Sequence, residues 1–411
     1  WKPGDDYNDI YTGWAYPPNN YEKFATLVYE WVKHSVERYG KAEVESWYWE
    51  LWNEPNIGYW KGTTEEYIKL YDYTADAVKR ALPTAKIGGP EVTGPRSEGA
   101  SKFLRTFLDH VANGKNYVTG KKGSPLDFVT FHAKGSPRVV DGVVQMSIRN
   151  QLRDIESGFA ILQSYPQFKH LPVVIGESDP EGCAACSEAI YPHNAYRNGT
   201  MYSSYTAASF ARKLDIADHH NTDLLGAVSW SFEFEDQPWF AGFRDLATNG
   251  VDKPVLNVFR MFGMMTGDRV DVAGQFNYDF KKILENGVRD ERDINALASM
   301  DEQHAAVMVW NYHDDNVIGE AAPVTVNIEG LPAEKIYLQH YRIDSEFSNS
   351  YEAWKKMGSP QSPSEAQIRE LEKAGQLQLL ESPQWISAQN GKASLAFELP
   401  QQGVSLLRLT W

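Results

Sequence analysis

Two glutamates stand where predicted strands end, and such carboxylates can do acid–base and nucleophilic chemistry. Glu54 follows the aromatic-rich segment 46–52, and Glu177 ends the apolar segment 172–177. In a barrel of parallel strands, catalytic groups sit at the C-terminal strand ends. A carboxylate pair there could hydrolyse a glycosidic bond, because one group protonates the leaving oxygen while the other attacks the anomeric carbon. Each glutamate could equally be a surface or capping charge.

The neighbours of these glutamates carry useful polar groups. Asn53 supplies an amide that can bind a sugar 2-hydroxyl, and Pro55 fixes the turn directly after the strand. His132 ends the predicted strand 127–132. It could bind substrate, or it could be a histidine whose hydrogen bonds are satisfied within the fold.

Other motifs point away from metal and cofactor chemistry. Cys183 and Cys186 form a C-x-x-C pair, for which we favour a structural role (a loop bridge or two free thiols) over metal or redox chemistry. The sequence contains no HExxH motif, no G-x-S-x-G motif and no G-K-[ST] motif. Two carboxylates and water suffice for glycoside hydrolysis, so no metal or organic cofactor is implied.

The elements that must position these residues alternate between strands and helices over residues 21–265. Apolar residues at helical spacing predict helices, and short apolar runs predict strands. Repeated βα units imply a parallel sheet, either doubly wound or closed into a barrel. The predicted strands cover 46–52, 85–88, 127–132, 172–177 and 224–232, and the predicted helices cover 24–39, 64–82, 102–111, 148–159, 200–218 and 254–264.

The pattern changes past residue 266. Most predicted elements there are strands, which favours an all-β sandwich, with one helical insert at 364–374 that Ser364 caps. We therefore predict a catalytic α/β domain over 1–265 and a C-terminal β-sandwich over 266–411. The predicted strands cover 305–310, 324–328, 336–342, 393–398 and 403–409.

Composition excludes several classes of partner. The net charge of −15 opposes binding to nucleic acid or to an anionic membrane. No apolar run of 18 residues is present that could span a bilayer. The 13 Trp, 22 Tyr and 18 Phe residues could stack on sugars, although core packing accounts for most of them. No signal peptide shows at the start of the chain, and the cellular compartment stays open.

An ordered set of motifs resembles glycoside hydrolase family 39, which belongs to the retaining clan of (β/α)8 barrels. Its W-N-E-P signature is moderately specific, and the set spans nearly the whole chain. The C-terminal stretches 341–344, 349–350 and 354–360 look like the β-xylosidase branch. The remaining matches are 48–56 (YWELWNEPN), 127–132 (DFVTFH), 175–177 (IGE), 234–238 (FEDQP) and 250–257 (GVDKPVLN).

The resemblance implies a role for each matching residue. Glu54 would be the acid/base, Glu177 the nucleophile, and Asn53 the ligand of the glycone 2-hydroxyl. His132 would lie beside the nucleophile. The carboxyl groups of a retaining pair should lie about 5–5.5 Å apart. Four further residues are candidates, each with a structural alternative. Glu235 would bind glycone hydroxyls or be a loop charge, and Trp230 would form the floor of the sugar site or pack in the core. Lys134 and Arg138 would contact substrate or be loop charges.

The function implied is a retaining exo-β-xylosidase that releases xylose from xylo-oligosaccharides. Alternatives are α-L-iduronidase, α-L-arabinosidase or β-glucosidase activity, or a non-catalytic carbohydrate-binding fragment. In this clan the acid/base follows strand four and the nucleophile strand seven. The predicted strands would then be strands four to eight, and at about 30 residues a unit the first three βα units find no room. An open sheet of only five such strands would expose an edge and an apolar interior, so we expect instability or association of a chain without those units.

Overall fold

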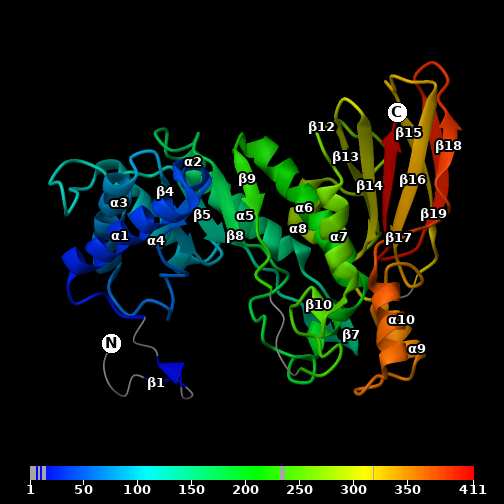
Figure 1. Ribbon diagram of the computed structural model, residues 1–411, viewed down its shortest axis with the longest axis horizontal. Coiled ribbons are helices and arrows are strands. Elements are labelled where there is room, and N and C mark those ends of the chain that lie inside the picture. Colours follow the sequence, from blue (N-terminus) through cyan, green and yellow to red (C-terminus); the bar gives the residue numbers. More distant parts are fainter. Residues whose placement is uncertain (1–5, 8–9, 12–14, 232–236, 318) are drawn as a thin grey trace. The chain divides into compact units, whose positions relative to one another are not determined.

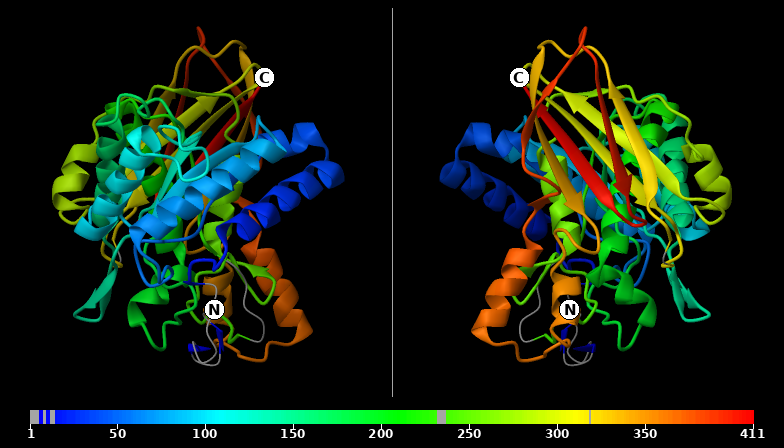
Figure 2. Two further views of the ribbon diagram at one scale, coloured as in Figure 1. Left: turned by 90° about the vertical axis from the view of Figure 1, so that its left-hand side faces the viewer. Right: turned by 90° about the vertical axis from the view of Figure 1, so that its right-hand side faces the viewer.

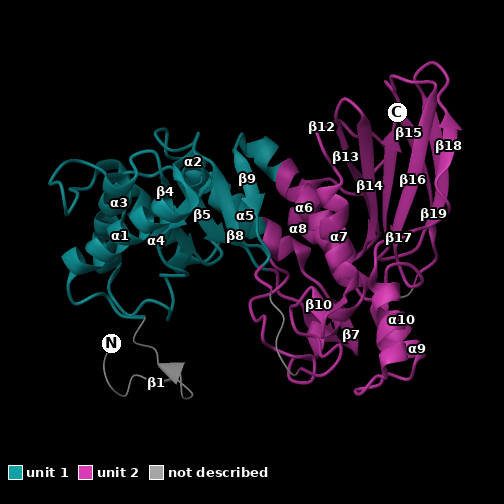
Figure 3. Cartoon of the chain, in the orientation of Figure 1, with its two compact units in different colours: residues 1–134, 153–178, 216–229 teal, residues 135–152, 179–215, 230–411 magenta. Residues whose placement is uncertain are grey.

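The computed structural model describes residues 6–7, 10–11, 15–231, 237–317 and 319–411. The chain forms two compact units, shown in Figure 3. Unit 1 contains residues 1–134, 153–178 and 216–229, and unit 2 contains residues 135–152, 179–215 and 230–411. This division differs from a single boundary after residue 265, which stays a prediction.

Unit 1 is built on a five-stranded parallel sheet whose strand order follows the chain. A sequential order is typical of barrel-type sheets, since a doubly wound sheet reverses its order at a switch point. The edge strands are β3 and β9, and Figure 1 shows β4, β5, β8 and β9 following one another in this order. The strands are β3 (Tyr48–Glu50), β4 (Lys86–Val92), β5 (Phe128–His132), β8 (Val173–Glu177) and β9 (Leu224–Ala227).

Local signals fix the helices around this sheet. Thr63 and Glu66 form a reciprocal capping box, as their spacing predicts. Asn20 caps the first helix, which ends at Gly40 with φ of 90°, a conformation that glycine adopts easily. The helices are α1 (Tyr21–Tyr39), α2 (Lys41–Ser46), α3 (Thr64–Ala81), α4 (Glu98–Asn113), α5 (Ile148–Gln163) and α6 (Thr200–His220), of which α5 and α6 run through both units.

The central strand β5 separates an apolar face from a polar one. Val129 and Phe131 are buried, and Phe131 packs edge-on against Phe159 of α5. The alternate residues Thr130 and His132 are also buried, and they point to the opposite face because side chains alternate along a strand. That face is therefore polar here, unlike the apolar interior we expected. On the two edge strands, Tyr48 of β3 and Leu225 of β9 are exposed.

Unit 2 contains the predicted β-rich region. A seven-stranded antiparallel sheet and a two-stranded sheet, β15–β19, enclose a cluster of buried apolar side chains that includes Val307, Leu407 and Val324. The strands of the larger sheet are β12 (Asp268–Val270), β13 (Asp293–Met300), β14 (His304–Tyr312), β16 (Lys335–Ile343), β17 (Gln378–Leu379), β18 (Gln384–Ser387) and β20 (Val404–Thr410). The smaller sheet pairs β15 (Ala322–Ile328) with β19 (Ala393–Leu399).

Shorter elements complete the two units, and Figure 2 shows the ribbon from two further sides. The predicted insert is α10, which Ser364 caps through a capping box with Gln367. No helix within the described ranges has the length and apolar character needed to cross a membrane. The remaining elements are α7 (Pro254–Gly263), α8 (Phe280–Asn286), α9 (Ser350–Lys356), α10 (Glu365–Gly375), the 3-10 helix η2 (Pro192–Asn198), and the strand pairs β1–β2 (Asp6–Tyr7, Ile10–Tyr11), β6–β7 (Arg138–Val140, Val143–Gln145) and β10–β11 (Ala247–Thr248, Val251–Asp252).

Candidate active site

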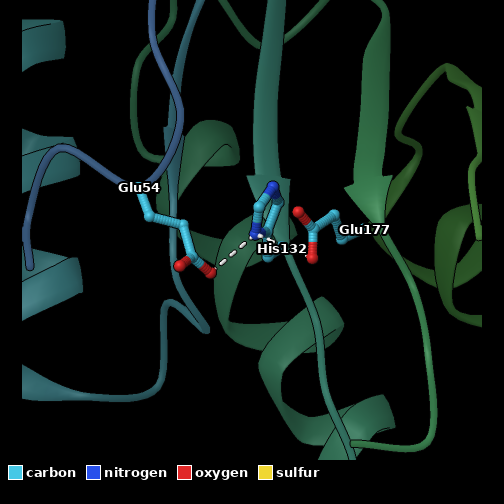
Figure 4. A group of neighbouring side chains, drawn as sticks. All are labelled: Glu54, His132 and Glu177. Atoms are coloured by element: carbon cyan, nitrogen blue, oxygen red, sulfur yellow. Dashed lines mark hydrogen bonds and ion pairs between the residues drawn. The ribbon is translucent and has the colours of Figure 1, made fainter. Parts of the chain in front are cut away.

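Glu54 and Glu177 come from opposite sides of the central strand β5 and point toward each other (Figure 4). Glu177 is the last residue of β8. Glu54 lies in the turn after β3, where Trp52 and Glu54 have φ values of 72° and 47°. Such left-handed conformations are strained for residues other than glycine, and they concentrate at functional sites. The Glu54 N–H donates to the Glu91 carbonyl oxygen at 3.0 Å, which fixes the turn against β4.

His132 lies between the two glutamates. Sheet register pairs His132 with Glu177, and His132 Nδ1 lies 2.8 Å from Glu54 Oε1 and 3.7 Å from Glu177 Oε2. One carboxylate oxygen of each glutamate and a His132 ring nitrogen all lie within 4.8 Å of one another. The two carboxyl groups therefore approach each other closely, as the attack of one of them on a sugar protonated by the other requires.

Lys134 contacts the site directly. Its Nζ lies 2.6 Å from Glu177 Oε2, and the two side chains are only 16% and 15% exposed. A partly buried ammonium at this distance attracts an ionised carboxylate more strongly than a surface pair would. The structure thus places a positive charge against the candidate nucleophile, where the sequence left Lys134 as either a substrate contact or a loop charge.

Two further glutamates, Glu50 and Glu91, lie behind His132, and sequence reasoning gave neither of them a role. Glu91 Oε1 is 2.9 Å from His132 Nε2. The Thr130 hydroxyl donates to Glu50 Oε1 and accepts from the Glu91 N–H at 3.1 Å. The signal that could have found Glu50 is its place in β3. Side chains two residues apart share one face of a strand, so Glu50 faces the same side as Tyr48.

Burial and pairing shift the protonation of this cluster. Burial, reinforced by the neighbouring Glu91 carboxyl, raises the pKa of Glu50 to about 9. Burial alone would lower the pKa of His132, but hydrogen bonds to Glu54 and Glu91 outweigh it and raise that pKa to about 9. At neutral pH, Glu50 therefore keeps its proton and His132 is an imidazolium.

The same three side chains, Glu54, His132 and Glu177, have the spacing of a possible cation site. The surrounding charges do not fit one, because the Lys134 ammonium already contacts Glu177 and both His132 nitrogens face carboxylates as donors. A ligand to a metal must be a neutral imidazole with a free lone pair. The donor set is suited to moving protons.

The other predicted site residues belong to different segments of the chain. The Asn53 side chain is exposed beside Glu54. Trp230 lies in unit 2, is 45% exposed and has the Arg244 guanidinium 5.8 Å from its ring. It follows β9, which ends at Ala227, so the predicted strand 224–232 is too long. Arg138 is exposed on β6 in unit 2, and Glu235 lies outside the described residues.

The loop after Glu177 is closed by a disulfide. Cys183 and Cys186 are bridged, one of the two structural forms that we considered. The guanidinium of Arg197, fully buried, forms an ion pair with Glu181 and donates to the carbonyl oxygens of Cys183 at 2.7 Å and Cys186 at 3.2 Å. A buried charge and a covalent link therefore hold the loop in one conformation.

A sequential parallel sheet with facing carboxylates at its C-terminal strand ends defines the class of (β/α)-barrel glycoside hydrolases. The model of glycosyl hydrolases family 39 matches residues 4–389. The chain belongs to this family. The predicted family is confirmed, and with it the broader architecture of a TIM-barrel-type domain followed by a C-terminal β domain.

The relatives include two enzyme activities. A β-xylosidase of Caldicellulosiruptor saccharolyticus is 27% identical over 385 residues, covering 89% of this chain and 69% of the relative. Mouse α-L-iduronidase is 25% identical over 387 residues, covering 84% of this chain but only 56% of the relative. The solved structure of a bacterial orthologue of human α-L-iduronidase has a TM-score of 0.77 at 19% identity, covering 95% of this chain and 66% of that one. At such identity, the structural likeness shows the fold alone.

Proposed function

We propose that the protein is a retaining exo-glycosidase that releases xylose from the non-reducing end of β-1,4-xylo-oligosaccharides. The observation that carries this proposal is the close approach of Glu54 and Glu177, whose nearest carboxylate oxygens lie within 4.8 Å. In the same proposal, β3, β4, β5, β8 and β9 correspond to strands four to eight of an eight-stranded barrel.

The first half of the reaction forms a covalent intermediate. A Glu177 oxygen attacks the anomeric carbon, while Glu54 gives a proton to the glycosidic oxygen as its bond to that carbon breaks. Lys134, 2.6 Å from Glu177 Oε2, orients the nucleophile and leaves its other oxygen to attack. The exposed amide of Asn53 would bind the glycone 2-hydroxyl.

The second half reverses the roles. Glu54, now a carboxylate, removes a proton from water, and the water oxygen attacks the anomeric carbon and displaces Glu177. Two inversions at the same carbon give net retention. Trp230 and Glu235 would contact the glycone.

A second candidate function is α-L-iduronide hydrolysis, favoured by one observation. A uronic acid needs a cation to hold its carboxylate, and Lys134 places an ammonium at the candidate nucleophile. Mouse α-L-iduronidase is also among the relatives. We rank this candidate second, because Lys134 is already paired with Glu177.

A panel of aryl glycosides tests these functions. We expect the purified chain to hydrolyse 4-nitrophenyl β-D-xyloside fastest, compared with the α-L-iduronide, α-L-arabinoside and β-D-glucoside. Proton NMR of the first product should show the β-anomer of xylose, and Glu177→Gln should abolish turnover. Faster hydrolysis of the iduronide would favour the second candidate. If the α-anomer of xylose is released first, retention is refuted. If the parent turns over no glycoside, and the parent and Glu177→Gln bind sugar with the same affinity, the protein is a carbohydrate-binding protein.

A further inference from the structure

The proposed mechanism requires a proton on Glu54, but the structure directs a donor at the same carboxylate. His132 Nδ1 lies 2.8 Å from Glu54 Oε1. An imidazolium there donates its N–H to the Glu54 carboxylate. In that arrangement, the histidine carries the proton that the first half of the reaction needs.

We propose that Glu91 is a positioning residue that acts through His132, holding the ring so that His132 transfers a proton to Glu54 in the first half of the reaction and recovers it in the second. The proposal rests on the proposed function, since it supplies the proton that the acid/base residue uses. Glu91 never touches the substrate.

The geometry of the ring leads to this assignment. His132 is fully buried and Glu91 is 5% exposed, so carboxylates rather than water face both ring nitrogens. A neutral imidazole has one N–H and one lone pair, and a lone pair facing an ionised carboxylate is unfavourable. The line Glu91–His132–Glu54 must therefore hold two protons, whichever atoms carry them.

Those two protons can be arranged in two ways without moving a heavy atom. In one arrangement the imidazolium donates to both carboxylates. In the other, the Nδ1–H bond has broken, an O–H bond has formed on Glu54, and Glu54 donates back to Nδ1 while Nε2–H still binds Glu91. Binding of a sugar excludes water and leaves the charges of Glu54 and Glu177 close together, which favours the second arrangement.

Four features of the structure position Glu91. Its N–H donates to Thr130 Oγ1 at 3.1 Å, and its backbone has a left-handed φ of 54°. A Cβ at Gly176 would overlap its Oε1, so only glycine there leaves room. Its Oε2 is buried, and within the described part of the chain no N–H or hydroxyl donor reaches it. The protonated Glu50 carboxyl hydrogen bonds with Glu91, so it is the neighbouring group that can provide such a donor.

The charges that face His132 come from several elements. Glu50 and Glu54 approach from β3 and its following turn, Glu91 from β4, and Glu177 from β8 with Lys134 against it. Tyr67 of α3 lies near Glu50 and Glu91, and burial raises its pKa well above the usual value, so it stays neutral. Among these groups, Glu91 is the carboxylate on the Nε2 side of the ring.

Glu91→Gln tests the proposal through leaving groups, because a good leaving group needs no proton. With an alkyl or phenyl xyloside, kcat should fall by about 10- to 100-fold at pH 7.5, within the range of acid catalysis, with little change in KM. With the 2,4-dinitrophenyl xyloside, the first step should change by less than about threefold. The pH optimum of Glu91→Gln for the phenyl xyloside should lie more than about one pH unit below that of the parent.

Asp72→Asn is the matched control. Asp72 is a fully buried carboxylate paired with His110 at 3.0 Å in the same unit. A merely structural role for Glu91 would make Glu91→Gln resemble this control, with lower thermal stability, equal losses for all leaving groups and an unmoved pH optimum. That result would overturn the proposal.

Nitrogen-15 NMR of histidine-labelled protein tests the same pair without turnover. The His132 signals are assigned because they are missing from the spectrum of His132→Gln. In the parent, both His132 ring nitrogens should be protonated at pH 7.5. In Glu91→Gln, one of the two protons should dissociate at a lower pH than it does in the parent. A singly protonated ring in the parent, or identical titrations in both proteins, would overturn the proposal. A parent that hydrolyses no glycoside would refute the proposed function, whereas an active parent with an unaffected Glu91→Gln variant would refute only this inference.

Discussion

Replacing Glu50 by Gln should make the protein more stable, and the gain should grow with pH. The folded-state pKa of Glu50 is about 9, against an ordinary value of 4.5. The folded chain therefore binds a proton that the unfolded chain has lost. Its contribution to stability is complete below pH 4.5 and is lost progressively as the pH rises toward 9. The loss amounts to about 1.4 kcal/mol for each pH unit, or about 3 kcal/mol at pH 7.

Gln should avoid this loss because it does not ionise and fits the same contacts. Its carbonyl oxygen can accept from the Thr130 hydroxyl, and its amide can donate to Glu91, as the protonated carboxyl does. We expect the difference in unfolding free energy between Glu50→Gln and the parent to rise by about 1.4 kcal/mol per unit between pH 5.5 and 8.5.

Urea denaturation at four pH values, followed by tryptophan fluorescence, measures this difference. Glu37→Gln is the control, because Glu37 is an exposed carboxylate on α1. Its difference from the parent should stay within about 0.5 kcal/mol at every pH. A Glu50→Gln difference that is constant with pH would refute the reasoning, since it would mean that Glu50 titrates alike in both states.

Three further outcomes follow from the site and its loop. Glu177→Gln should lower turnover of the xyloside at least about 10⁴-fold with an unchanged melting temperature, as measured by initial rates and calorimetry. Lys134→Met should lower kcat/KM for the xyloside by about tenfold, and a much larger loss for the iduronide would mean that Lys134 binds a substrate carboxylate. Arg197→Met should destabilise the protein by about 1–3 kcal/mol, because it leaves the carbonyl oxygens of Cys183 and Cys186 without this donor. Arg369→Met, which removes an exposed pair, should change the urea midpoint little.

The strands that end at His132 and Glu177 could be predicted closely from the sequence. The predicted 127–132 and 172–177 each begin one residue before β5 and β8 and end where they end. Both strands are short apolar runs with turn signals on either side, so local pattern and burial agree. The positions of His132 and Glu177 at the strand ends followed directly.

The C-terminal end of β4 depends on pairing with a distant strand, which the local sequence pattern does not show. Gly88-Gly89-Pro90 is typical of a turn, and the strand was predicted to end at Gly88. In the structure, β4 continues to Val92, because Pro90 pairs with Thr130 of β5. Tertiary pairing thus overrides the local breaker signal. Glu91, which local pattern places in a loop, becomes a buried strand residue.

The burial of Glu91 is better explained by chemistry than by stability. It combines a charge removed from water, a left-handed backbone and a dependence on Gly176, and each of these features is unfavourable or restrictive for folding. A buried ion pair gives little net stability, because desolvation offsets the attraction between the charges. We therefore attribute the burial of Glu91 to its effect on the protonation and orientation of His132. Since removing the carboxylate leaves that ring without a partner on Nε2, the loss should appear first in proton transfer to Glu54.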